Sequence, residues 1–120
     1  QKLKISESNS FLYEKVADFS NSLEKDYKNQ VGIVVGGTHP TEIGNLRKHC
    51  PDLVFLIPGF GAQGGTLDEI LKQSDINSII NSSRTIIFSS KEKNFADAAN
   101  KKAIEINIEM KKFYEKLTQY

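Results

Sequence analysis

The sequence contains a single cysteine, Cys50, no tryptophan and no long hydrophobic run. One cysteine excludes an internal disulfide, and we expect a reduced, buried thiol. No apolar stretch approaches the ~20 residues needed to cross a membrane, and the first residues show no signal-peptide pattern. We therefore expect a cytoplasmic protein that does not enter a membrane.

An excess of charge of one sign is also missing. The 16 lysines and arginines are balanced by 15 aspartates and glutamates, which leaves a net charge of +1. Arms that bind nucleic acid and patches that bind membrane surfaces need a basic excess, so we expect neither partner. The hydrophobic fraction of 38% is somewhat low for a domain that folds on its own.

Short apolar runs alternate with stretches in which apolar residues recur with a helical period. The runs at 31–35 and 53–57 predict buried strands, and the apolar stretch at 79–88 predicts a third strand, alone or after a turn. The periodic stretches predict four helices. The first and last span 9–26 and 93–118. The second starts at Pro40 after an N-cap at Thr38 and stops before Pro51, and the short third helix opens with a capping box at Thr66. This order is typical of an α/β fold with a parallel sheet.

Three strands are too few for the common parallel-sheet folds. A closed (β/α)8 barrel and a flavodoxin-like sheet both need more strands. On its own, a three-stranded sheet would leave two apolar edge strands unpaired, which favours aggregation. We therefore expect the chain to be a segment of a larger domain, or to pair its sheet edges with another chain.

The carboxyl ends of the predicted strands carry glycines and polar residues, and ligands of α/β proteins bind at this edge. Glycines in the loop from Pro58 to Gly65 let backbone N–H groups approach an anion. Gln63 can donate from its side-chain amide, and the planar guanidinium of Arg84 matches phosphate oxygens. The sequence therefore predicts a phosphate-binding site. In (β/α)8 barrels, the loops after the last two strands often form such a site.

Two other interpretations fit the same glycines. The string from Gly59 to Gly64 matches the dinucleotide fingerprint G-x-G-x-x-G. Pro58 directly before the first glycine is unusual in that fingerprint, and residues 88–90 are Phe-Ser-Ser where an acidic residue should close the next strand. In the second interpretation, the glycines form only a tight turn and Arg84 is a surface charge.

Three strings at the expected strand ends have the order and spacing of one enzyme family. They are Val34-Val-Gly-Gly-Thr-His-Pro40, Phe55-Leu-Ile-Pro-Gly-Phe-Gly-Ala-Gln-Gly-Gly65 and Asn81-Ser-Ser-Arg84. The chain resembles orotidine 5′-phosphate decarboxylase, in its longer bacterial and protozoan-type branch. The resemblance implies that residues 1–120 form one segment, the C-terminal part of a (β/α)8 TIM barrel. It would hold the last three βα units and the preceding helix, with about three parallel strands and four helices.

The resemblance also implies an activity and a set of binding residues. Enzymes of this family are carboxy-lyases of pyrimidine biosynthesis that convert orotidine 5′-phosphate (OMP) to UMP and CO2 as homodimers, without a metal or organic cofactor. Gln63 and Arg84 match residues on the 5′-phosphate, the backbone N–H of Ser83 would lie near it, and Pro58 would lie near the pyrimidine. Gly59, Gly61 and Gly64 would shape the loop, and Thr38 would lie at the rim. Gly37 replaces a usual alanine and Phe60 a usual β-branched aliphatic residue.

One element of the family pattern is absent from this chain. The family's chemistry rests on lysines and aspartates that include an Asp-x-Lys-x-x-Asp string, and no such string occurs here. We therefore expect the chain to hold the phosphate-binding part of the site, to need the N-terminal part of the barrel as a partner, and to be inactive alone. The alternatives are a non-catalytic phosphate- or nucleotide-binding α/β module, or another phosphate-binding TIM-barrel enzyme. The string Ala62-Gln-Gly-Gly65 argues against the latter.

Overall fold

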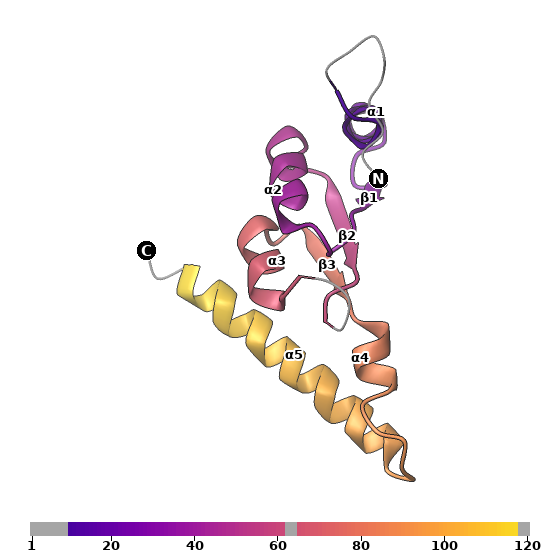
Figure 1. Ribbon diagram of the computed structural model, residues 1–120. Coiled ribbons are helices and arrows are strands. Elements are labelled where there is room, and N and C mark those ends of the chain that lie inside the picture. The colour runs from indigo at the N-terminus through magenta and orange to yellow at the C-terminus, as the bar shows by residue number, and fades with distance from the viewer. Residues whose placement is uncertain (1–9, 62–64, 118–120) are drawn as a thin grey trace.

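The computed structural model describes residues 10–61 and 65–117 (Figure 1). These residues form three parallel strands and five helices, so the α/β class predicted from the sequence is confirmed. The elements in chain order are α1 (Leu12–Asp26), β1 (Gly32–Val34), α2 (Pro40–His49), β2 (Val54–Pro58), α3 (Leu67–Gln73), β3 (Ser78–Asn81), α4 (Ser83–Ile87) and α5 (Phe95–Leu117). Among the described residues, no helix is both long and apolar enough to span a membrane.

Strand β2 lies at the centre of the sheet, between β1 and β3. Its side chains Phe55 and Ile57 point into the core and are fully buried, as the unbroken apolar run predicted. They pack with buried residues of α1, α2 and α3, among them Ala17, Ile43, Leu46 and Ile70. Cys50 belongs to the same core and is completely buried, which confirms the predicted buried thiol.

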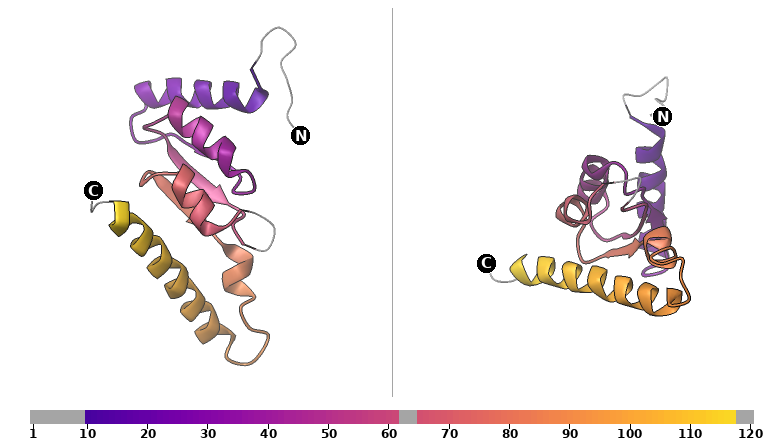
Figure 2. Two further views of the ribbon diagram at one scale, coloured as in Figure 1. Left: turned by 60° about the vertical axis from the view of Figure 1, so that its left-hand side comes forward. Right: turned by 60° about the horizontal axis from the view of Figure 1, so that its bottom comes forward.

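Helices cover only one face of the sheet (Figure 2). Along that face α1 contacts α2, α2 contacts α3, and α3 contacts α5. Side chains on the other face are apolar and exposed: Val34 is 70% exposed, Val54 40% and Ile79 58%. In a closed barrel, side chains on this face would fill the interior.

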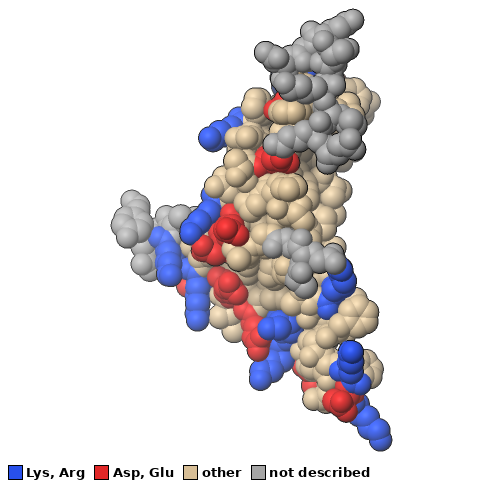
Figure 3. Space-filling model, viewed as in Figure 1, with Lys and Arg blue, Asp and Glu red and all other residues tan. Residues whose placement is uncertain are grey.

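The size of the molecule agrees with an open structure. Its accessible surface is 8695 Å², whereas a compact protein of this mass has about 6,500 Å². Its radius of gyration is 16.5 Å, against about 14 Å for a compact domain of this length. The exposed apolar side chains of the sheet contribute to this surface. Charges of both signs are interspersed along α5 at the surface (Figure 3).

The predicted strand at the end of the 79–88 stretch is wrong. Ile79 and Ile80 do lie in a strand, but β3 ends at Asn81, and Thr85, Ile86 and Ile87 belong to the short helix α4. The reason lies in the neighbouring strand, which leaves the ladder at Gly59 in a left-handed conformation (φ 92°). Residues after Asn81 therefore have no strand to pair with. The described part of the chain has five helices instead of four for this reason.

Two helix starts test the capping predictions. Thr66 forms the predicted capping box with Glu69, whose backbone N–H donates to Thr66 Oγ1 at 3.3 Å and whose carboxylate accepts from the Thr66 N–H at 2.9 Å. The predicted N-cap at Thr38 is wrong, because His39 occupies that position without a side-chain cap bond. Pro40 suits the first helical position, because it has no N–H that would be left unpaired there.

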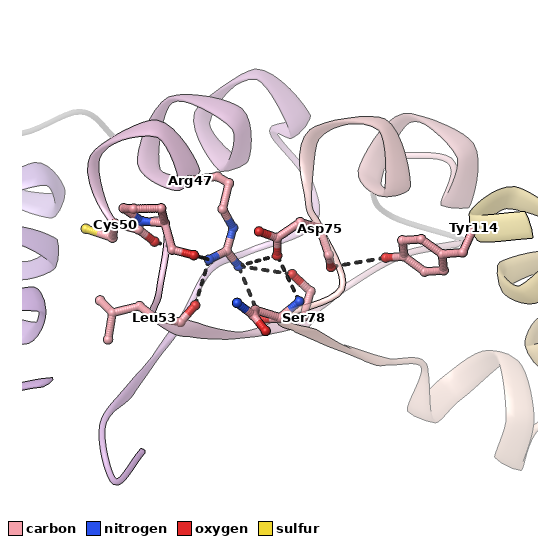
Figure 4. Close-up of polar contacts among 8 residues, drawn as sticks. Arg47, Cys50, Leu53, Asp75, Ser78 and Tyr114 are labelled. Atoms are coloured by element: carbon pink, nitrogen blue, oxygen red, sulfur yellow. Dashed lines mark hydrogen bonds and ion pairs between the residues drawn. The ribbon is translucent and has the colours of Figure 1, made fainter. Parts of the chain in front are cut away.

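Arg47 of α2 fastens the amino ends of β2 and β3 together (Figure 4). Its Nη1 donates to the carbonyl oxygens of Cys50 (3.2 Å), Pro51 (3.2 Å) and Leu53 (2.7 Å), just before β2. Its Nη2 donates to the carbonyl oxygen of Asn77, just before β3, at 3.2 Å. One guanidinium thus binds backbone carbonyl groups just before β2 and just before β3.

The same guanidinium is held by side chains around it. It pairs with Asp75 at 3.2 Å, donates to Ser78 Oγ at 3.2 Å and lies over the Phe55 ring, 3.7 Å from its centroid. Burial lowers the pKa of Arg47, and the Asp75 charge opposes that shift. Tyr114 of α5 donates to the carbonyl oxygen of Asp75 at 3.1 Å, so the long C-terminal helix is tied to the same loop.

The substitution Arg47→Met, made in a full-length protein that contains this chain, should lower the free energy of unfolding by about 3–5 kcal/mol. It leaves backbone carbonyls and the Asp75 carboxylate without their cation. Urea unfolding measures the change. Lys102→Met, which removes an exposed ion pair with Glu105, serves as the control and should change little. Equal stability of the two variants would contradict the account of Arg47.

Candidate functional site

The loops that follow the three strands meet at the carboxyl edge of the sheet. The parallel register places Pro58 beside Asn81 at the ends of β2 and β3. The backbone N–H of Gly37, after β1, donates to the carbonyl oxygen of Pro58 at 2.7 Å. The N–H of Gly65 donates back to the Gly37 carbonyl oxygen at 3.1 Å. The first loop therefore holds both ends of the glycine-rich loop.

Two glycines of that loop adopt conformations that other residues rarely take. Gly59 has φ 92° and Gly61 has φ 100°, both in the left-handed region. At Gly61 there is also little space, because a Cβ would lie 2.8 Å from Thr85 Oγ1 of α4. Open space surrounds Gly59, where nothing lies within 4 Å of an added Cβ. The loop thus turns sharply at both glycines and touches α4 at the second.

A pocket of about 250 Å³ lies between the ends of β2 and β3. It contains four of the residues that the sequence predicted for the site, Pro58, Gly59, Ser83 and Arg84. The full lining is Pro58, Gly59, Phe60, Asn81, Ser82, Ser83, Arg84 and Thr85. The structure therefore brings together the glycine-rich loop and the Ser-Arg pair, which are more than twenty positions apart in the sequence.

The other predicted site residues lie outside this lining. Thr38 is exposed in the loop after β1, and Gly61 lies behind the pocket against Thr85. Gln63 and Gly64 fall outside the described residues. The roles of Gln63 and Gly64 therefore stay predictions that rest on the family resemblance.

The two departures from the family pattern fit their surroundings. A Cβ at Gly37 would lie 3.0 Å from both the Pro58 carbonyl oxygen and Ile70 Cδ1, so glycine suits the tight contact in this chain. Phe60 is half-buried, packs against the core and forms one wall of the pocket. It does not close the space beside Arg84.

Sequence reasoning missed three polar residues of the pocket. Asn81 accepts a hydrogen bond from Ser83 Oγ at 2.9 Å through its Oδ1. Thr85 lies against the glycine-rich loop. Ser82 is buried, and its Oγ has no hydrogen-bond partner among the described residues. Asn81 begins the string Asn81-Ser-Ser-Arg84 that the sequence analysis placed at the carboxyl edge of the sheet, and that position was the signal that could have revealed it.

The chemistry of the lining favours binding of an anion. Arg84 is the one charged residue among the described lining residues, and none of them is acidic. A guanidinium, a backbone N–H and side-chain hydroxyls and amides suit the oxygens of a phosphate group. The described lining offers no carboxylate or lysine for acid–base work. The described lining therefore suits an anionic ligand.

The close approach at Gly61 can be tested with a double-mutant cycle in a full-length protein. Both Gly59→Ala and Gly61→Ala should be destabilising by about 1 kcal/mol or more, because alanine resists positive φ. Gly61→Ala should cost more, since its Cβ also meets Thr85. Adding Thr85→Gly should recover that extra cost for Gly61→Ala and not for Gly59→Ala, as measured by thermal unfolding. No coupling between positions 61 and 85 would refute the contact.

Comparisons with known proteins point to one family, although no protein-family model matches the chain. An orotidine 5′-phosphate decarboxylase of Leptospira interrogans is 43% identical over 107 residues, which are 89% of this chain and 38% of that protein. One of Rhodopirellula baltica is 40% identical over 97 residues, 74% of this chain and 32% of that protein. The chain therefore spans about two fifths or less of the length of these curated relatives, in their C-terminal part.

Solved structures give the same result. The OMP decarboxylase of Leishmania donovani is 30% identical with a TM-score of 0.67, over 92% of this chain and 42% of that one. The UMP synthase of the same organism is 34% identical with a TM-score of 0.68, over 89% of this chain and 24% of that one. The resemblance to orotidine 5′-phosphate decarboxylase drawn from the sequence is confirmed, and so is the match of the fold to part of a TIM barrel.

Proposed function

We propose that this chain is the C-terminal part of an orotidine 5′-phosphate decarboxylase and supplies the phosphate-binding edge of its active site. The observation that carries the proposal is the pocket at the carboxyl edge of the sheet, in which Arg84 and the glycine-rich loop meet. Its position agrees with the place where α/β barrels bind phosphate groups. The identity to curated relatives of that name supports the choice of substrate.

The proposed roles come from the family resemblance, and the position of Arg84, Ser83 and Pro58 in the lining of the pocket supports them. Arg84 binds the 5′-phosphate with its guanidinium, and Ser83 contributes its backbone N–H. Pro58, on the face of the sheet that would line the barrel, lies beside the pyrimidine. Gly59 and Gly61 bend the loop so that its backbone can follow the phosphate. The family resemblance adds Gln63 and Gly64 in the same loop and Thr38 at the rim.

The bond-breaking groups belong to the rest of the barrel. In the proposed enzyme, aspartates crowd the carboxylate of OMP, which leaves as CO2, and a lysine protonates the ring carbon to give UMP. The binding energy from the phosphate, which does not react, can be used to hold the pyrimidine against those groups. This division explains why the described lining of the pocket contains no acid–base pair.

The N-terminal part of the barrel is the partner that the structure needs. It would pair with the free edges of β1 and β3 and cover the exposed side chains Val34, Val54 and Ile79. As family members do, the intact enzyme would form a homodimer, in which one aspartate of each site comes from the neighbouring subunit. We also propose that the intact enzyme is cytoplasmic.

The exposed apolar face also weighs against an independent binding module. Such a module would have to fold alone, and it would then present three apolar side chains of the sheet to water. Another phosphate-binding barrel enzyme is disfavoured, because the relatives compared above are named for OMP decarboxylation or UMP synthesis. No specific observation in the described part of the structure favours either alternative.

In the full-length protein, Arg84→Ala should weaken UMP binding by about 2–3 kcal/mol, because charge-assisted hydrogen bonds to the phosphate are lost. Uridine, which lacks the phosphate, should bind equally well to both proteins. Isothermal titration calorimetry measures both affinities. Lys91→Ala, an exposed cation in the loop after α4, is the matched control and should leave both unchanged. Unaltered UMP affinity in Arg84→Ala would remove Arg84 from the site.

The purified 120-residue chain should have no decarboxylase activity, because the Asp-x-Lys-x-x-Asp string is absent from it. Conversion of OMP to UMP can be followed by absorbance, with the full-length enzyme as the positive control. Turnover by the isolated chain would contradict the proposed division between phosphate binding and chemistry.

A further inference from the structure

We propose that Asn81 is a further substrate-binding residue, whose amide nitrogen donates a hydrogen bond to the phosphate of the nucleotide. Ser83 acts as its positioning residue. This inference rests on the proposed function, because it takes the phosphate to lie in the pocket beside Arg84. Neither the family resemblance nor the sequence pattern assigned a role to Asn81.

Asn81 lies at the carboxyl end of the sheet. It is the last residue of β3 and the register partner of Pro58. Ile79 and Asn81 are exposed while Ile80 is half-buried and Ser82 buried, so Asn81 lies on the same face as Ile79. That face would line the barrel. Asn81 therefore lies at the top of the interior surface, beside the residue proposed to contact the pyrimidine.

A hydrogen bond from Ser83 fixes the side-chain amide of Asn81. Ser83 Oγ donates to Asn81 Oδ1 at 2.9 Å. A serine hydroxyl has one proton, and an asparagine amide has one acceptor oxygen and two donor protons. The bond therefore uses the hydroxyl proton of Ser83 and the oxygen of Asn81. The donor nitrogen Nδ2 is the part of the pair that is left for a ligand.

The free donor of Asn81 matches the acceptor oxygens of a phosphate ligand. Asn81 and Arg84 line the same pocket of about 250 Å³. A phosphate monoester presents only acceptor oxygens when it is doubly ionised, so it can accept from Nδ2 as well as from the guanidinium. Because the Ser83 hydroxyl proton is engaged by Asn81, Ser83 is left to bind the phosphate through its backbone N–H. The pair thus adds a donor to the pocket without adding a charge.

The experiment uses the full-length protein and measures the affinities of UMP and uridine for four variants. Asn81→Ala removes the donor, and Asn81→Asp keeps the acceptor for Ser83 but replaces the donor with a negative charge. Both should weaken UMP binding about 10- to 100-fold, and leave uridine within roughly threefold. Ser83→Ala, which frees the amide but keeps the backbone N–H, should weaken UMP binding only a few-fold.

Asn77→Asp is the matched control, since it makes the same change in another exposed asparagine. Asn77 directly precedes the first residue of β3, at the end of the strand away from the pocket. It should leave UMP affinity unchanged, and thermal melting verifies that each variant is folded. If Asn81→Ala and Asn81→Asp bind UMP like the wild type while Arg84→Ala does not, the inference is overturned and the proposed function stands. Equal losses for UMP and uridine would also overturn it, because the contact would then lie away from the phosphate. A wild-type protein that does not bind UMP would overturn both.

Discussion

The half-buried guanidinium of Arg47 is the contact on which the arrangement of the sheet depends. It binds carbonyl oxygens just before β2 and just before β3, among them those of Leu53 and Asn77, and is itself held by Asp75. A slip of one residue between parallel strands would turn every side chain to the other face. By joining the amino ends of the two strands, Arg47 fixes which residues lie side by side at their carboxyl ends.

The pocket is the result at the other end of the same two strands. Pro58 and Asn81 are register partners, so the glycine-rich loop and the Ser83-Arg84 turn begin side by side. The sheet face that leads away from this pocket is apolar and exposed. We propose that a substrate anchored by its phosphate extends over that face toward groups on the rest of the barrel.

Much of the fold and part of the site could be predicted from the sequence. Unbroken apolar runs identified β1 and β2, and helical periodicity identified α1 and α5, because burial imposes these patterns directly. The helix at Thr85 was missed, since a short apolar run does not reveal whether a neighbouring strand is there to pair with it. Arg47 and Asn81 were missed for a related reason. Their roles depend on strand register and on contacts with backbone atoms, neither of which leaves a pattern of residue types.

The most direct test of the account is a crystal structure of the full-length protein with UMP bound. The account predicts that the phosphate lies between the glycine-rich loop and α4, within hydrogen-bond distance of the Arg84 guanidinium and the Ser83 backbone N–H. The pyrimidine should then lie over the face that carries Pro58. A phosphate bound elsewhere, with Arg84 directed into solvent, would contradict it.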